Sequence, residues 1–371
     1  MYLLNELLLS IPLAIYVCLR VRSLLPSKPL KNVWTAVFVA LAAAYPVAET
    51  LSHRATDGGL GLLVLLGYYA LPLLLYLILT VLVVDAVVGL LRLARIVSRE
   101  TVRTPLFKSR RLIVSLVLPV LIVALGAVNH RLLRVKEYRV EIPRRSAAAQ
   151  ELTVVFMSDL HFRDLTSNRF LDELVEKVNR QNPDLILLGG DLLEGDRHGE
   201  DTTRYERVFH SLRARFGLLG ASGNHEGFSH GGFDGFIERA GVRLLQDEAV
   251  PVDEALLVAG LRDPHREVGR PVGEVLAAAP RHDLPVILLA HQPLGFDAAR
   301  AAGVDIQLSG HTHHGQLFPV NFITAWEYDL SWGHLERGGA HLFVTSGVQG
   351  WGPPVRTIGR SEILVLHLVL K

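Results

Sequence analysis

Long apolar stretches occupy the first third of the chain. Four of them stand out, at residues 7–19, 33–51, 60–91 and 112–128. A helix needs about 20 apolar residues to cross the hydrocarbon core of a bilayer, so the second and fourth fit directly, and the first fits when residues 2–4 join it. The third is longer and contains Gly67, Pro72 and Asp85. We expect one tilted or kinked helix there, with a tight helical hairpin as the alternative. The pattern thus predicts a four-helix transmembrane anchor over residues 1–130.

From about Glu137 the pattern changes to short apolar runs separated by amphipathic stretches. The runs predict strands at 138–142, 152–157, 185–188, 218–221, 256–259, 286–290, 306–308, 341–345 and 363–368. Apolar residues recur at helical spacing in 169–180, 204–215, 232–240 and 273–279, which predicts helices there. Alternating strands and helices are typical of an α/β domain. We therefore predict a juxtamembrane linker with the first strand at 131–149 and an α/β domain at 150–371.

Charge divides the chain in the same way. Residues 1–130 carry 12 Lys or Arg against 5 Asp or Glu, although the whole chain carries 38 against 37. The remainder is therefore acidic, which makes nucleic acid an unsuitable partner. The one cysteine, Cys18, excludes an intramolecular disulfide framework and a Cys-rich zinc module. Nothing in the sequence indicates the oligomeric state.

Basic residues in the short loops indicate the orientation, because Lys and Arg favour the cytoplasmic side. Residues 20–32 hold four and residues 92–111 hold seven, whereas residues 52–59 hold only Arg54. With four crossings, both termini lie outside the cytoplasm. Six basic residues after the fourth stretch argue the other way: Arg131, Arg134, Lys136, Arg139, Arg144 and Arg145. A hairpin at 60–91 would also place the domain in the cytoplasm. We expect a multi-pass integral membrane protein whose domain faces the extracytoplasmic side.

Asp85 is the one ionisable residue deep in an apolar stretch. Such a residue is often functional in a membrane. Because no second intramembrane charge is evident, we interpret Asp85 as a residue near a helix end, or one that pairs with a neighbouring helix.

Polar residues follow five successive predicted strands. They form the blocks Asp159-Leu160-His161, Gly190-Asp191, Gly223-Asn224-His225-Glu226, His291 and Gly310-His311-Thr312-His313. Ligands of α/β sheets bind beyond the carboxyl ends of the strands, so these side chains are expected around one crevice. A lone histidine is more often a surface or hydrogen-bonded residue, and an Asp after a strand is often a helix N-cap. Five such blocks in succession favour a binding site instead.

The residue types suit two divalent cations. Asp159 and His161 can point into one site from a turn, and the carboxylate of Asp191 can bridge two cations with its two oxygens. His311 and His313 lie on another turn, where one can serve each cation. Asn224 and His291 complete the second set: they follow two other strands. Imidazole with carboxylate and amide oxygen favours manganese, iron or zinc over magnesium alone.

These blocks resemble, in order, the motifs of the calcineurin-like metallophosphoesterase superfamily over residues 150–371, and most closely its membrane-tethered branch. The resemblance implies a double β-sandwich flanked by helices. It implies Asp159, His161, Asp191 and His313 at one metal, Asp191, Asn224, His291 and His311 at the other, and His225 and Asp191 as catalytic residues. His314 stands where glycine is usual in that branch, which leaves the ligands intact.

The block after Asp191 continues Leu192-Leu193-Glu194-Gly195-Asp196, without the arginine that phosphoprotein phosphatases of the superfamily place there. A phosphoprotein substrate is therefore disfavoured.

The sequence thus predicts a membrane-anchored, metal-dependent phosphoesterase with two divalent ions. Its partners would be membrane lipids and an amphiphilic phosphoester or pyrophosphate substrate, such as a phospholipid or nucleotide-linked glycolipid. Trp326, Trp332 and Trp351 are candidates for an interfacial lip. The alternatives are a phosphodiesterase for soluble or cyclic phosphodiesters and a catalytically inactive metal-binding sensor. A transporter finds little support, because paired intramembrane charges and repeat halves are not evident.

Overall fold

The computed structural model of the chain describes residues 2–52, 58–142, 150–163, 166–194, 202–228, 232–265 and 268–371. The chain forms two compact units. One comprises Met1–Val128 with Gly352–Thr357, and the other comprises Asn129–Trp351 with Ile358–Lys371. Arg54, Arg144 and Arg145 of the loop-charge argument, and Gly195 and Asp196 after the Gly-Asp block, lie outside the described residues.

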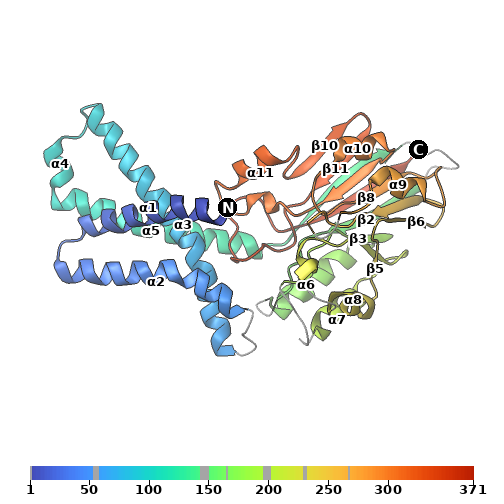
Figure 1. Cartoon of the computed structure of the whole chain (residues 1–371), viewed down its shortest axis with the longest axis horizontal. Helices are drawn as coiled ribbons and strands as arrows, with labels where there is room; N and C mark the ends of the chain where they lie inside the picture. The colour runs from blue at the N-terminus through green and yellow to red at the C-terminus, as the bar shows by residue number, and fades with distance from the viewer. Residues whose placement is uncertain are drawn as a thin grey trace. The chain divides into compact units, whose positions relative to one another are not determined.

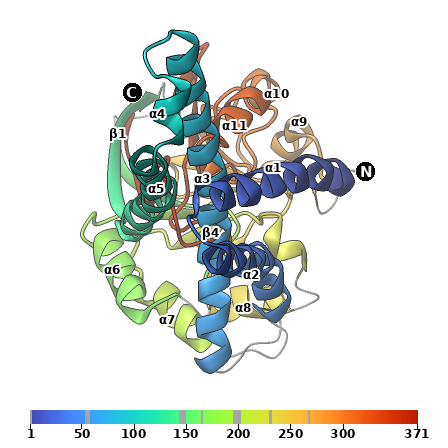
Figure 2. The same cartoon turned by 90° about the vertical axis from the view of Figure 1, so that its left-hand side faces the viewer.

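The first unit is helical. It contains α1 (Tyr2–Leu24), α2 (Lys28–Ser52), α3 (Gly58–Leu93), α4 (Arg99–Arg103) and most of α5 (Pro105–Arg131). Figure 2 shows α3 crossing α1. Because α3 is one helix of 36 residues, the hairpin alternative is wrong. Within the described residues, α2, α3 and α5 are long and apolar enough to cross a membrane. The predicted stretch near the start is helical as well, and its crossing stays a prediction.

Large apolar side chains cover the outside of these helices. Leu66, Leu90 and Leu125 are examples, each more than half exposed. A water-soluble protein rarely exposes so much apolar surface. A smaller set packs between the helices around Val17, Phe38 and Leu77, among others. The arrangement is that of helices solvated by lipid.

Asp85 of α3 is paired inside this unit. Its carboxylate accepts from Arg20 Nε and from Tyr16 Oη, both of α1, at 2.5 Å, and it forms an ion pair with Arg111 of α5. Two charges that we had assigned to loops therefore face Asp85. The pairing with neighbouring helices agrees with a structural role for this residue.

The second unit holds two six-stranded sheets. The first has the order β1-β12-β2-β3-β4-β5 and the second β10-β11-β9-β8-β7-β6. The strands are β1 (Arg134–Ile142), β2 (Gln150–Met157), β3 (Leu185–Leu188), β4 (Leu218–Gly220), β5 (Arg243–Leu244), β6 (Glu248–Val252), β7 (Leu256–Gly260), β8 (Val286–Leu289), β9 (Ile306–Ser309), β10 (Gly333–Arg337), β11 (Ala340–Val344) and β12 (Glu362–Leu370). Strands β2, β3 and β4 run parallel, as do β7, β8 and β9.

One core lies between the sheets. Phe156 and Leu187 from the first sheet pack with Ile287, Leu308 and other residues of the second. Figure 1 shows helices on the outside of the sheets. The first sheet is covered by α6 (Asn168–Asn179), α7 (Thr203–Ser211) and α8 (Gly232–Arg239), and the second by α9 (Val272–Ala277) and α10 (Phe296–Ala301). The unit is thus the predicted double β-sandwich flanked by helices.

Every predicted strand of this unit is present. Strands β5, β6 and β10, and the helices α10 and α11 (Asn321–Glu327), were not predicted. The stretch set apart as a linker contains β1, which pairs in parallel with β12 from Arg134 to Ile142. Strand β1 is therefore an edge strand of the sandwich and belongs to the same compact unit.

Candidate metal centre

The loops that follow the strands have an unusual backbone. Asp159, His161, Asp191, His311 and His313 all have positive φ angles, between 41° and 67°. Residues other than glycine rarely adopt this left-handed region, and such residues gather where a site requires it. Three of the five strand-end blocks are thus held in turns with a left-handed backbone.

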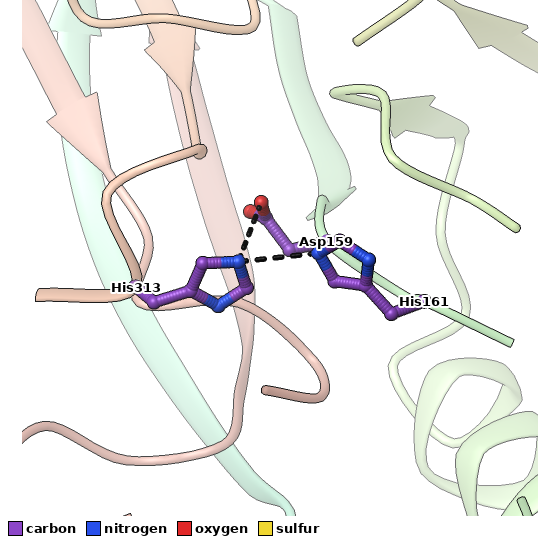
Figure 3. A group of neighbouring side chains, drawn as sticks. All are labelled: Asp159, His161 and His313. Atoms are coloured by element: carbon purple, nitrogen blue, oxygen red, sulfur yellow. Dashed lines mark hydrogen bonds and ion pairs between the residues drawn. The ribbon is translucent and has the colours of Figure 1, made fainter. Parts of the chain in front are cut away.

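The first cluster joins Asp159, His161 and His313. The Nε2 atoms of the two histidines lie 3.2 Å apart, and Nε2 of His313 lies 3.4 Å from Oδ1 of Asp159 (Figure 3). Asp159 follows β2, whereas His313 begins η2 (His313–Gly315), which follows β9. The backbone N–H of His311 donates to Asp159 at 3.0 Å and so ties the two loops together.

The second cluster joins Asp191, Asn224, His291 and His311. Nε2 of His291 lies 3.2 Å from Oδ2 of Asp191 and 3.1 Å from Oδ1 of Asn224. Nδ1 of His311 lies 2.8 Å from the same Asn224 oxygen. Nδ1 of His291 lies 2.7 Å from the carbonyl oxygen of Gly189, so that contact turns Nε2 toward the cluster.

Asp191 connects the clusters. Its Oδ2 lies 3.2 Å from Nε2 of His291 and 3.7 Å from Nε2 of His161. The side chain is buried after two glycines, and a Cβ on Gly223 would collide with Oδ1 of Asp191. All seven predicted ligands are thus brought together around the carboxylate of Asp191.

The donor chemistry fits divalent cations. Ring nitrogens and side-chain oxygens, all of which can act as metal ligands, converge at about 3 Å in both clusters. Imidazole, carboxylate and amide oxygen together suit manganese, iron or zinc. The residues therefore fit the metal ions that the sequence motifs imply.

The charges agree with this interpretation. Burial disfavours the charged form of His291, but the Asp191 carboxylate outweighs it and raises the pKa of His291 to about 10. Burial acts likewise on His161, and Glu194 raises the pKa of that histidine to about 8. Burial, together with the charge on His291, lowers the pKa of His311 to about 4. The centre thus attracts positive charge at His161 and His291.

His225 lies at the edge of the clusters. Its ring packs edge-on against His161 with the centroids 4.8 Å apart, and its backbone N–H donates to Oδ1 of Asp191 at 2.9 Å. Burial, with the charge on His161, lowers the pKa of His225. The side chain keeps 19% exposure, whereas that of His161 keeps 1%. The ring of His225 is therefore more accessible than that of His161.

Two carboxylates that the sequence analysis did not assign support the site. Oε2 of Glu194 lies 2.5 Å from Nδ1 of His161. Glu226 is buried and accepts from the backbone N–H groups of Asp191 at 3.0 Å and Gly223 at 2.5 Å. Glu226 thus ties the loop after β3 to the loop after β4. Glu194 lies in the block after Asp191, and Glu226 directly follows His225. The residue types alone did not reveal these supporting roles.

A second unassigned group borders His311. Asp263, buried after β7, accepts from Nε2 of Gln292 at 2.8 Å. The ring of His265 stacks on His311 with the centroids 6.1 Å apart, and Tyr328 packs edge-on against the same ring at 6.3 Å. Asp263 and His265 form an Asp-x-His motif after β7, and the sequence analysis did not include this motif among its five blocks.

Comparison with known proteins agrees with the site. Residues 152–315 match the family model described as calcineurin-like phosphoesterase. An uncharacterized metallophosphoesterase of Campylobacter jejuni is 33% identical over 270 residues, covering 70% of each chain. A transmembrane protein with metallophosphoesterase domain of Danio rerio is 28% identical, over 76% of this chain and 68% of that protein.

An uncharacterized metallophosphoesterase of Helicobacter pylori is 30% identical, over 60% of this chain and 61% of its own length. The chain thus spans between 61% and 70% of the length of these relatives. Its helical unit and its relatives make it a membrane protein. The chain belongs to the calcineurin-like metallophosphoesterase family and is a metal-dependent phosphoric ester hydrolase.

Proposed function

We propose that the protein hydrolyses a phosphoester or pyrophosphate bond in a lipid-linked substrate, such as a phospholipid or nucleotide-linked glycolipid, at a dinuclear metal centre. The observation that carries the dinuclear centre is the position of Asp191. Its carboxylate lies within 3.7 Å of a histidine of each cluster, so one charged group serves two adjoining sites. With the predicted ligands complete, a catalytically inactive sensor finds no support.

The residues divide the work by position. Asp159, His161 and His313 would hold one ion, Asn224, His291 and His311 would hold the other, and Asp191 would serve both. When bound, the ions would attract the phosphoryl oxygens of the substrate and lower the pKa of a bound water molecule. Glu194 orients His161, and the carbonyl of Gly189 orients His291.

His225 then acts on the leaving group. Its ring is partly exposed beside Asp191 and Glu194. An imidazole in this place protonates the leaving oxygen or stabilises the negative charge that develops on it. The side chain of Glu194, with Oε1 3.6 Å from Nδ1 of His225, helps to fix the ring.

The lipid-linked substrate is supported by the anchor. Helices α2, α3 and α5 hold the enzyme at a bilayer, although the predicted ligands all lie in the second unit. An anchored enzyme gains local concentration on an amphiphile and avoids extracting acyl chains into water, which costs about 0.8 kcal/mol for each CH₂ group. A soluble phosphodiester would gain neither advantage.

The test measures metal content and hydrolysis together, on full-length protein in lipid nanodiscs. Two manganese, iron or zinc ions are expected for each chain, with turnover of a nitrophenyl phosphodiester. Asp191→Asn should lose most of both ions and the activity, because the bridging charge is gone. The matched control is Asp172→Asn, an exposed change on α6 that should alter neither quantity. Two retained ions and a normal rate in Asp191→Asn would refute the bridging role.

The substrate class needs a separate experiment. Lipids from a strain that lacks the protein should contain an accumulated phosphorylated amphiphile, and the purified protein should hydrolyse that species. If no lipid accumulates and only soluble or cyclic phosphodiesters are cleaved, the lipid substrate is wrong and the metal centre stands.

A further inference from the structure

Helix α11 has its amphipathic character reversed. Its exposed residues include Phe322, Ile323 and Trp326, which are 63%, 59% and 89% exposed, while Asn321 and Thr324 are less exposed. A helix on a globular domain normally buries its apolar side chains and exposes its polar ones. Phe318, 46% exposed, stacks edge-on against Phe322 with the centroids 5.7 Å apart.

We call Phe318, Phe322, Ile323 and Trp326 the α11 patch. The other tryptophans of this region differ from Trp326. Trp332 is packed, because its indole N–H donates to Glu362 at 2.7 Å and its ring lies 5.0 Å from the ring of His314. Trp351 is 45% exposed. Of the three tryptophans expected at an interfacial lip, Trp326 is therefore the most exposed, and it belongs to the α11 patch.

The patch adjoins the metal centre along the chain and in space. Helix α11 begins six residues after Gly315 ends η2, and a Cβ on Gly315 would collide with the backbone of Asn321. Immediately after the helix, Tyr328 packs against the ring of His311. Helix α11 therefore lies next to the turns that carry two predicted ligands, His311 and His313.

We propose that the α11 patch inserts into the lipid surface of the bilayer that holds the helical unit, and so docks the rim of the metal centre on the membrane. The chain itself indicates this occupant. Only two residues separate the end of α5 at Arg131 from the start of β1 at Arg134, a span of about 10 Å. The first strand of the second unit therefore follows, within a few residues of the chain, a helix that is long and apolar enough to span the membrane.

The side chains of the patch suit that occupant. Tryptophan and phenylalanine favour the interface between headgroups and acyl chains, where apolar rings leave water. The docking rests on the membrane location of the protein and does not require a lipid substrate. It would, however, bring the metal centre to the depth at which phosphate groups of lipids lie.

A spin-label experiment tests the docking. Replacing Cys18 by Ser removes the one cysteine, and Ala325→Cys then places a nitroxide on the exposed side of α11 with the patch intact. In the full chain, reconstituted in phosphatidylcholine and phosphatidylglycerol vesicles, this label should collide more with oxygen than with a water-soluble nickel complex. A label at Glu176, exposed on α6, should show the opposite preference.

Residues of the α11 patch are then substituted in the protein that carries the nitroxide at position 325. Phe322→Ser with Trp326→Ser should abolish the preference for oxygen, and folding should be retained because both side chains are exposed. The matched control, Val268→Ser, changes a fully exposed apolar residue outside the patch and should leave the preference unchanged. A label at 325 that behaves like the one at 176 would overturn the proposal. Shielding from both reagents would overturn it too, and would indicate a protein partner or a second copy.

Discussion

At the scale of single residues, the contacts of each histidine in the loops distinguish its role. His291 and His161 each have one ring nitrogen held by a neighbour, at the carbonyl of Gly189 and the carboxylate of Glu194. Their other nitrogens face the clusters. His225 instead reaches Asp191 with its backbone and keeps a partly exposed ring. In the proposed mechanism, holding an ion and acting on substrate are therefore tasks of different histidines.

This division leads to a prediction for His225→Ala. The variant should lose about a hundredfold in rate, the usual scale for a general acid, while its metal content stays unchanged. The loss should be smaller for nitrophenyl esters than for alkyl esters, since a nitrophenolate leaves without a proton. His282→Ala, an exposed histidine far along the chain from the blocks, is the control. Equal losses with both leaving groups would argue against proton donation.

The residue types of the ligands were predictable because their spacing is local. Asp159 and His161 stand two apart, as do His311 and His313, and each pair directly follows a strand. Glu194 and Glu226 were not predictable, because a carboxylate becomes a support only through partners 33 to 35 residues away. Those partners are Nδ1 of His161 for Glu194 and the N–H of Asp191 for Glu226. Such contacts depend on how β2, β3 and β4 pair.

At the scale of elements, the metal centre depends on how closely the loops after β2 and β9 approach. Gly310 lies against Asp159 and Ser158, and a Cβ at this position would collide with side-chain oxygens of both. The loop carrying His311 and His313 therefore reaches Asp159 only because residue 310 has no side chain.

Gly310→Ala should consequently separate the two loops. We expect overpacking to destabilise the protein by about 1–3 kcal/mol and the cluster of Asp159, His161 and His313 to bind metal more weakly. Metal analysis and thermal unfolding measure both effects. Gly273→Ala is the control, because nothing lies within 4 Å of a Cβ there. If Gly310→Ala keeps full metal content and an unchanged melting temperature, the close approach is unimportant.

Elements with a strong apolar pattern were predictable, and short or polar ones were not. Leu185–Leu188 and Val286–Leu289 are wholly buried strands, so their sequence is continuously apolar. Strand β10 (Gly333–Arg337) has no fully buried residue and forms because β11 pairs with it. Helix α11 was missed for a related reason: its apolar residues face outward, so no core pattern marks it.

At the scale of the whole molecule, the basic residues after the last apolar stretch had argued against an extracytoplasmic domain. In the structure, the four of them that are described, Arg131, Arg134, Lys136 and Arg139, belong to the second unit. Arg139 pairs with Glu151 at 3.0 Å, and the Lys136 ammonium lies 5.2 Å from the ring centroid of Tyr138 in the same strand. Charges in a large domain weigh little in orientation, whereas charges in short loops weigh much. The basic residues in the loop between α3 and α5 are therefore the stronger indication of which side of the membrane each segment faces.

This argument predicts the side of the membrane that the metal centre faces. Because α3 is one helix, a cytoplasmic loop before α5 puts everything after α5 outside the cytoplasm, whether or not α1 crosses. Alkaline phosphatase fused after Lys371 should be active, and a fluorescent protein that matures only in the cytoplasm should be dark there. The same reporters fused after Val97, between α3 and α5, should give the opposite pair. An inactive phosphatase and a bright fluorescent protein at Lys371 would mean that α5 runs the other way, and the substrate would then have to be a lipid of the cytoplasmic leaflet.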